Sequence, residues 1–390
     1  NIYDTRYLYL INLAVIPDPP GDVIHCEKCD HFLIRGNVLN GGEDQDAHET
    51  VKVNQSQFVF IESSDISGTY ENAIDFVAVQ YGHITGNRLH NAGDWCAYVK
   101  GGSAYIRVEG NEIYDCGTGG FTAGQGTGFQ YMVAPWIQYE AYDIKVVNNV
   151  IHDTFGAGLG VNGGYNILLA HNTLYRVGEN SHTVEFAFGF RSCDGQPGDE
   201  GRERCDQNLA AGGWGTTAID DGTNAARIPN KNVFVYNNLL YNPPGYQSQW
   251  QNFAIFGPFS GAPQNGSNAP VPTLADDNLQ IRGNILWDGG PDHPLGIEDP
   301  EQGCQPSNPV CNADQLRAEN AINTIEPGLI DPADGNFHPA PGGNVYSAVT
   351  FPIPDFAWDV PAPAGELSNA VTTDRDGSAR EALSPPGAYK

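Results

Sequence analysis

Basic residues are scarce in this sequence. Its 390 residues include only 19 Lys and Arg against 47 Asp and Glu, a formal net charge of -28. Nucleic acids are bound through basic surfaces that neutralise phosphates, so this balance argues against a nucleic-acid-binding protein. Long apolar runs are also lacking: the longest, residues 7–16, contains Asn12 and is too short to cross a bilayer. We therefore expect neither a nucleic-acid nor a membrane partner.

Charged residues of either sign make up only 17% of the chain, whereas Gly (47) and Pro (27) are abundant. Helical bundles and coiled coils are built from Ala, Glu, Lys and Leu, so this composition excludes them. A hydrophobic content of 40% is too high for a disordered chain. The composition indicates a strand-rich protein of one large or two ordinary domains.

The eight cysteines fall into local pairs in a chain with a single Met, which favours disulfides and an oxidising compartment. Nearest-neighbour pairing is the preferred scheme among many possible ones. The spacing of Cys26 and Cys29 also suits zinc, but no second such pair lies nearby. No basic-then-apolar leader follows Asn1, so we expect a secreted protein whose export signal has been removed. The preferred pairs are Cys26/Cys29, Cys96/Cys116, Cys193/Cys205 and Cys304/Cys311.

A short phrase built around an Asn, preceded in most copies by Gly or Asn, recurs along the chain with a base spacing of about 23 residues. This period is too short for two packed helices and suits one coil of a solenoid with three short strands. Apolar and polar residues alternate around each phrase, as strands require. The sequence therefore predicts an all-β fold, a right-handed parallel β-helix. The phrase occupies residues 35–41, 86–91, 110–115, 148–153, 171–176, 237–242 and 283–288.

The recurring Asn fits a bend between two strands, where it tolerates a left-handed backbone. Asn side chains stacked from coil to coil are also expected to hydrogen-bond in a ladder. Within each coil one strand precedes this Asn, a second follows it, and a third comes after a loop. The third strands are predicted at residues 51–53, 76–80, 97–100, 159–162, 184–191 and 253–256.

The spacing of the phrase also divides the chain into two regions. Residues 1–325 are predicted to form the β-helix, with insertions at about 126–142, 192–232 and 257–277. All three insertions follow a third strand, so they would build a wall along one side of one face, where function is usually carried. Residues 326–390 are rich in Pro and Asp and are expected to form an irregular tail on the solenoid. The first strand-like segment lacks an obvious cap, which raises end-to-end self-association as an option.

The repeats between Asp22 and Asp288, and the tail phrases at residues 331–337 and 386–389, resemble the secreted right-handed β-helix proteins of the pectate-lyase superfamily. The resemblance implies a polysaccharide substrate lying on the strand face beside the long loops. In the lyases of that superfamily a Lys or Arg abstracts a proton, and acidic side chains often hold calcium. Chondroitinase-B-like and alginate lyases have an acidic residue five positions before that lysine, where this chain has Trp95.

Alternation along the third strands predicts which side chains point outward. With Val77 and Val79 inward, for example, Gln80 points out. Abstraction of a proton next to a uronate carboxylate needs a base and a group that stabilises the enolate charge. Lys100 is the leading candidate for the base, Lys52 a weaker one, and Arg191 a candidate charge stabiliser. Candidate substrate-binding residues are Tyr98, Gln80, Gln125, Asn162, Trp136 and Tyr139.

Acidic residues gather before the third strands, and neighbouring coils would bring them together as oxygen ligands for Ca²⁺. The candidate calcium ligands are Asp46, Glu49, Asp75 and Asp94. The preferred function is a polysaccharide lyase that cleaves a uronate-containing polysaccharide by β-elimination. A glycoside hydrolase that uses two of these carboxylates, or Glu185, is the first alternative. A non-catalytic glycan-binding or structural solenoid is the second.

Overall fold

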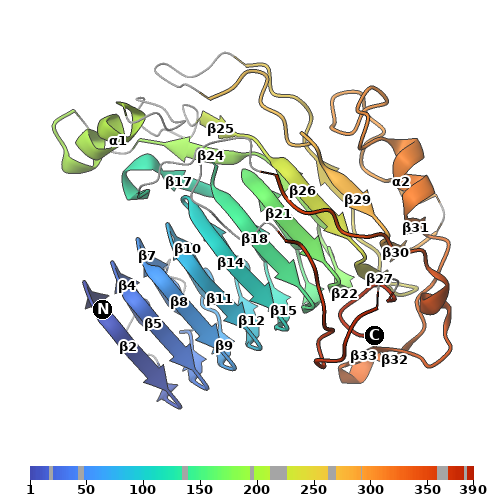
Figure 1. Ribbon diagram of the computed structural model, residues 1–390, viewed down its shortest axis with the longest axis horizontal. Helices are drawn as coiled ribbons and strands as arrows, with labels where there is room; N and C mark the ends of the chain where they lie inside the picture. The colour runs from blue at the N-terminus through green and yellow to red at the C-terminus, as the bar shows by residue number, and fades with distance from the viewer. Residues whose placement is uncertain are drawn as a thin grey trace.

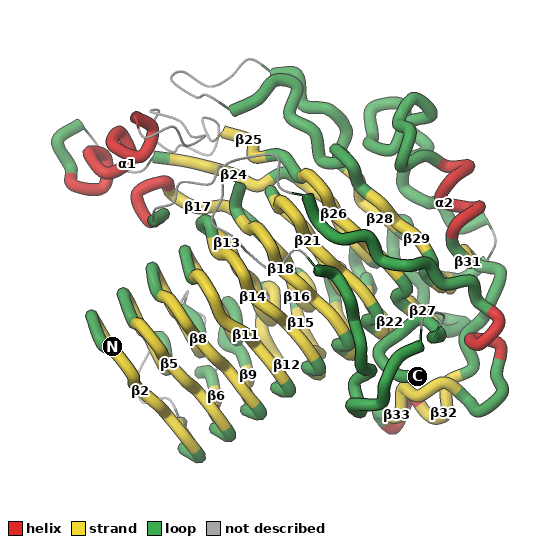
Figure 2. Tube along the Cα trace, viewed as in Figure 1, coloured by secondary structure: helices red, strands yellow, loops and turns green. Residues whose placement is uncertain are grey.

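The computed structural model describes residues 1–16, 21–42, 48–133, 139–193, 197–210, 226–261, 269–290, 292–357, 368–381 and 384–390. Its body is a solenoid of three long parallel sheets, seen from the side in Figures 1 and 2. Each turn of the chain adds one strand to each sheet, so the predicted right-handed parallel β-helix is confirmed. No helix in these ranges is long and apolar enough to cross a membrane.

The strands of the three sheets follow one another coil by coil. Sheet A contains β1 (Ile2–Tyr3), β4 (Ile24–Glu27), β7 (Val51–Asn54), β10 (Ile74–Val77), β13 (Trp95–Lys100), β16 (Gly119–Ala123), β20 (Ala157–Asn162), β23 (Val184–Ala187) and β28 (Phe253–Ile255). Sheet B contains β2 (Arg6–Ile11), β5 (Asp30–Arg35), β8 (Gln57–Glu62), β11 (Gln80–Thr85), β14 (Ser103–Glu109), β18 (Ala141–Val147), β21 (Gly164–Ala170), β26 (Lys231–Tyr236) and β29 (Gln280–Arg282). Sheet C contains β3 (Ala14–Val15), β6 (Val38–Asn40), β9 (Asp65–Ser67), β12 (Arg88–Ala92), β15 (Glu112–Cys116), β19 (Val150–Thr154), β22 (Thr173–Val177), β27 (Leu239–Asn242), β30 (Ile285–Asp288) and β31 (Ala321–Ile322).

The expected asparagine ladder runs through the inside of the solenoid. Asn87 donates from Nδ2 to Oδ1 of Asn111 at 3.0 Å, and Asn111 donates in the same way to Asn149 at 2.9 Å. The side-chain oxygen of each ladder residue also accepts a hydrogen bond from the backbone N–H of the preceding ladder residue, as Oδ1 of Asn111 does from Asn87. The ladder therefore satisfies polar groups at the bends of the coils from Asn87 onward, which burial would otherwise make costly. It continues through Asn149, Asn172, Asn238, Asn284 and Asn320.

The left-handed backbone at these bends lies one residue earlier than predicted. The residues before the ladder asparagines from Asn87 to Asn284 have positive φ, for example Gly86 (65°) and Asn148 (56°), whereas the ladder residues themselves do not. The backbone N–H and the side-chain Nδ2 of a ladder residue both donate to the Asn of the next coil. The residue before it is free of these contacts, and it is there that the chain bends. Glycine or asparagine occupies most of these preceding positions because both tolerate positive φ.

One third strand was predicted in the wrong register. The strand on sheet A ends at Val77, and Phe76 rather than Val77 packs in the core. The chain bends at Ala78, where φ is 56°, and Gln80 begins β11 on the next sheet. The prediction that Val77 points inward and Gln80 outward on the third strand is therefore wrong. A bend between sheets interrupts the alternation, and an Ala at that bend carries no sequence signal.

All four nearest-neighbour disulfides are present as predicted, which leaves Cys26 and Cys29 bonded to each other instead of to zinc. The insertions lie at the corner between sheets A and B, at the upper edge in Figure 1. They contribute a small sheet of β17, β24 and β25, together with a helical turn and α1. The bounds are β17 (Gly126–Gly128), η1 (Phe129–Tyr131), β24 (Gly189–Ser192), α1 (Glu200–Ala210) and β25 (Ala226–Ile228).

The C-terminal residues run back along sheet B, in front of β18, β21 and β26 in Figure 1. The ring of Phe356 packs 5.2 Å from that of Phe234, and Arg380 donates to Oδ1 of Asn148 at 3.0 Å. The tail thus reaches the middle coils as well as the last ones. The remaining elements are α2 (Ala313–Glu319), β32 (Leu329–Asp331), η2 (Pro332–Asp334), β33 (Asn336–Pro339) and η3 (Asn344–Ser347).

Candidate functional site

A pocket of about 320 Å³ lies on the outer face of sheet A, beside the first insertion. Its floor comes from β7, β10 and β13, and its wall comes from β17 and η1. The predicted candidates Lys52 and Lys100 both line this pocket. The lining residues are Glu49, Lys52, Asn54, Asp75, Val77, Tyr98, Lys100, Gly126, Thr127, Gly128 and Tyr131.

The parallel register brings these side chains together. Lys52, Asp75 and Tyr98 are direct partners in β7, β10 and β13. Val77 and Lys100 are partners one position along from the core residues Phe76 and Val99. Because side chains alternate across a strand, the neighbours of core residues point outward. Strand pairing therefore aligns residues that lie more than twenty positions apart in the sequence.

Lys52 lies between two carboxylates. Its Nζ is 2.9 Å from Oε2 of Glu49 and 3.6 Å from Oδ2 of Asp75. Burial, followed by repulsion from Asp75, raises the pKa of Glu49 to about 8. Burial lowers the pKa of Lys52, but the charge of Asp75 and the interaction with Glu49 outweigh it and raise that pKa overall. Lys52 is thus a charged cation, and the raised pKa of Glu49 favours its protonated form at neutral pH.

Lys100 has a different environment. Its Nζ is 3.1 Å from Oη of Tyr98 and 3.0 Å from Oε1 of Gln125, and it lies 4.3 Å from the centre of the Tyr98 ring. Within the described ranges it forms no ion pair with a carboxylate. Burial, followed by the charge of Asp75, raises the pKa of Tyr98 well above its ordinary value, so this phenol stays protonated. Two neutral groups therefore hold Lys100 in place.

The other predicted residues are only partly brought to this face. Gln125 holds Lys100, and Asn162 donates to Oε1 of Glu185 at 3.0 Å further along the sheet. Gln80 is buried and donates to Oη of Tyr142 at 3.2 Å, so its predicted exposure is wrong. Tyr139 is also buried, stacked 4.8 Å from Tyr165, and does not reach the pocket. Trp136 and Asp46 lie outside the described residues.

Arg191 does not point outward as predicted. It lies on β24 with 0% of its side chain exposed, and its Nε donates to Oε1 of Glu140 at 2.8 Å. The other oxygen of Glu140 accepts the N–H of Gly101 at 3.0 Å, directly after Lys100. Arg191 and Glu140 therefore join the insertion to the end of β13. The chain leaves sheet A after β23, so alternation along the predicted strand did not apply to Arg191.

No group of three or more Asp, Glu, His or Cys side chains converges as a metal site within the described ranges. Of the predicted calcium ligands, Glu49 and Asp75 both contact the ammonium group of Lys52. That cation occupies the position between them, and Asp94 is not among the residues that line the pocket. Asp75 therefore pairs with Lys52, with Glu49 hydrogen-bonded to the same ammonium group, and calcium binding stays a prediction.

His25 carried no prediction from the sequence, although it lies beside Lys52 in the register of the neighbouring strands β4 and β7. Its Nδ1 is 3.1 Å from Oδ2 of Asp22, and its Nε2 is 3.3 Å from Nδ2 of Asn54. The signal was present in the sequence, because residues 24–27 and 51–54 share one alternating pattern. His25 thus adds a fourth side chain to the cross-strand row formed by Lys52, Asp75 and Tyr98.

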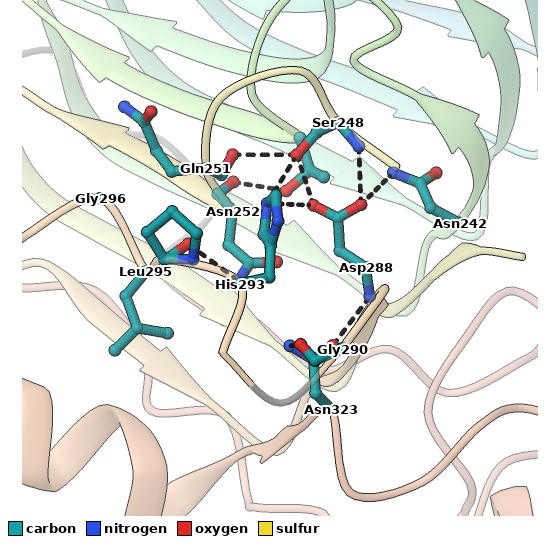
Figure 3. A network of polar contacts seen from close by, with 12 residues as sticks. Asn242, Ser248, Gln251, Asn252, Asp288, Gly290, His293, Leu295, Gly296 and Asn323 are labelled. Carbon is teal, nitrogen blue, oxygen red and sulfur yellow. Dashed lines mark hydrogen bonds and ion pairs between the residues drawn. The ribbon is translucent and has the colours of Figure 1, made fainter. Parts of the chain in front are cut away.

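A Ser, His and Asp cluster in the last coils resembles a catalytic triad but lacks its geometry (Figure 3). Ser248 Oγ and Asp288 Oδ2 both contact the same nitrogen, Nε2 of His293, at 3.1 and 3.0 Å. In a triad, the base uses one nitrogen for the nucleophile and the other for the carboxylate. Ser248 also hydrogen-bonds Asp288 directly and is 4% exposed. This cluster is a buried structural network joining two loops.

Residues 22–186 match the family model described as a right handed beta helix region. The chain is similar to the A-module of a mannuronan C-5 epimerase from Azotobacter vinelandii, with 14% identity and a TM-score of 0.40. The match covers 68% of this chain and 54% of the epimerase module. PfbA, a surface adhesin of Streptococcus pneumoniae, is 10% identical with a TM-score of 0.39, covering 68% of this chain and 66% of its own. The Dettilon tailspike protein is 12% identical with a TM-score of 0.36, covering 68% of this chain and 55% of its own. The sequence matches no curated protein at a significant level.

Proposed function

We propose that this protein is a secreted polysaccharide lyase that cleaves a uronate-containing polysaccharide by β-elimination on the outer face of sheet A. The observation that carries the proposal is the pocket into which Lys52, Tyr98 and Lys100 all open. Two of only 19 basic residues in the chain meet there. An open strand face walled by an insertion suits a linear polymer, and the four disulfides suit an extracellular location.

The chemistry of β-elimination assigns a role to each of these groups. The base takes the proton next to the uronate carboxylate, the electron pair of that bond forms a C=C bond, and the glycosidic oxygen leaves with a proton. In its amine form Lys100 has two N–H groups for Tyr98 and Gln125, which leaves its lone pair for the substrate proton. The protonated phenol of Tyr98 is a suitable proton donor to the leaving oxygen. Lys52 supplies the positive charge that stabilises the enolate.

Protonation of Glu49 makes the pocket more receptive to an anionic sugar. At neutral pH the ammonium group of Lys52 then faces one charged carboxylate, Asp75, instead of two. When the pH rises through about 8, Glu49 ionises and adds a negative charge beside Lys52. The pocket thus becomes less favourable for a uronate in alkaline solution, in a chain that already carries a net charge of -28.

We therefore expect the affinity for a uronate oligosaccharide to fall about tenfold between pH 7 and pH 9. The variant Glu49→Gln, which cannot ionise, should lose most of this pH dependence. Isothermal titration of both proteins across this pH range measures the effect. Identical pH profiles for the two proteins would contradict the role given to Glu49.

A glycoside hydrolase is the second candidate, and one observation favours it. Glu49 is kept protonated, and the carboxylate of Asp75 approaches the same lysine nitrogen. A protonated acid and a neighbouring carboxylate are the two groups that glycoside hydrolysis requires. In this alternative Glu49 protonates the leaving oxygen, and Lys100 only binds the substrate.

The two candidates give different products. We expect incubation with acidic polysaccharides to produce the ultraviolet absorbance of unsaturated ends together with new reducing ends. Reducing ends without that absorbance would replace the lyase by the hydrolase. No product from a broad panel of acidic and neutral polysaccharides would instead favour a non-catalytic glycan-binding or structural solenoid.

A further inference from the structure

A second polar cluster lies on the outer face of sheet A, toward its C-terminal end. The carboxylate of Glu185 contacts Nδ2 of Asn162 at 3.0 Å with one oxygen and Nε2 of His182 at 3.2 Å with the other. Glu185 on β23 lies in the same cross-strand row of sheet A as Tyr98 on β13. The two strands are separated by β16 and β20, which keep the same register. Strands are spaced about 4.8 Å apart, so three steps place this cluster roughly 14 Å from the pocket.

An exposed indole stands next to this cluster. Trp250 is 53% exposed, and its ring centre lies 5.9 Å from that of His182. An indole combines a large flat apolar face with a polar N–H group, which is why Trp is enriched at binding interfaces. A flat ring beside hydrogen-bonding groups suits a sugar, whose C–H face packs on the ring while its hydroxyls reach the polar side chains. We name this cluster of Asn162, His182, Glu185 and Trp250 the Trp250 subsite.

The Trp250 subsite differs from the lysine pocket in having, among the described residues, no cationic side chain like Lys52 beside its carboxylate. In the described part of the chain, Glu185 forms an ion pair with His182 only and has no Lys or Arg within ion-pair distance. A carboxylate without a strong cation repels a uronate, whereas it accepts hydrogen bonds from hydroxyl or amino groups. The two ends of the face therefore favour different sugars.

We infer that the Trp250 subsite binds a sugar without a carboxylate, so that the substrate is a heteropolysaccharide in which a uronate and a non-acidic sugar lie a few residues apart. This inference rests on the proposed function, since it assumes that the lysine pocket holds the uronate. It predicts that a pure uronate polymer is a poorer ligand than a mixed one, although it carries more of the negative charge that Lys52 attracts.

The test compares two oligosaccharides of equal length, an alternating glucuronate–N-acetylhexosamine chain and an oligogalacturonate. The variant Trp250→Ala should bind the alternating chain about tenfold more weakly, the usual cost of truncating a well-placed Trp. Glu185→Gln should weaken binding of the alternating chain and strengthen binding of the oligogalacturonate. Opposite signs for the two ligands cannot arise from a merely damaged fold. Tyr346→Ala, an exposed aromatic on the tail (46% exposed), is the matched control and should change neither affinity.

Binding should be measured in a Lys100→Met background, where the proposed base is absent and the ligand stays intact. Equal effects of Glu185→Gln on both ligands, or no effect of either variant, would overturn the inference. Failure of the inference leaves the proposed function standing if Lys100→Met alone abolishes unsaturated product. Conversely, undiminished product from Lys100→Met would reject the assigned base, while the ligand preference of the Trp250 subsite could still be observed.

Discussion

The variant Arg191→Met is expected to be less stable than the wild type by about 3–5 kcal/mol, the usual cost of removing one partner of a buried ion pair. Arg191 and Glu140 are both fully buried, so the substitution leaves the Glu140 carboxylate without its cation. It also removes a guanidinium that lies 5.0 Å from the ring of Phe129 in the insertion. Chemical denaturation followed by far-ultraviolet circular dichroism measures the change in the free energy of unfolding.

Two further variants separate this explanation from a general effect of losing an arginine. Arg6→Met removes an exposed arginine whose nearest carboxylate, Asp30, is 4.0 Å away, and should change stability by less than about 0.5 kcal/mol. Adding Glu140→Leu to Arg191→Met removes the unpaired charge and should restore part of the lost stability. If Arg191→Met were as stable as Arg6→Met, the ion pair would not hold the insertion as described.

The fold was predictable because its determinants are local and periodic. The Gly-Asn phrase returns with each coil, and one ladder amide such as Asn111 makes the same contacts as the next, Asn149. The disulfides also join neighbouring cysteines, as in Cys96–Cys116. Short sequence separations and a repeating pattern leave few alternatives, so simple alternation was enough to identify the coils.

The site was predictable only where the alternation continues without a bend. Lys52 and Lys100 follow core residues in regular strands, and both reach the pocket. Arg191 lies at the edge of one insertion and Tyr139 within another, and insertions have no repeat, so their neighbours in space could not be inferred from spacing. The raised pKa of Glu49 depends on burial and on Asp75 from another coil, which no linear pattern records.

The variant Lys100→Met is expected to lower the turnover of unsaturated product by about 10²- to 10⁴-fold, the usual contribution of a positioned acid–base group. Methionine keeps most of the length of the side chain and removes the amine. The strand β13 is held by its neighbours β10 and β16, so the fold should persist. If Lys100 only bound the substrate, KM would rise while kcat changed little. Steady-state kinetics of product formation, with thermal melting as a check of folding, distinguishes these outcomes.

Lys28→Met is the matched control, because Lys28 has a half-exposed side chain whose ion pair is with its neighbour Glu27, at 3.4 Å. Its kinetics should equal those of the wild type. Lys52→Met should also lower kcat, because Lys52 is assigned to the charge that develops in the transition state. A lyase whose kcat falls with Lys52→Met but not with Lys100→Met would have as its base either Lys52, the weaker candidate, or His25, its neighbour on β4. The two lysines thus test separate steps of the same elimination, one the removal of the proton and the other the stabilisation of the charge it leaves.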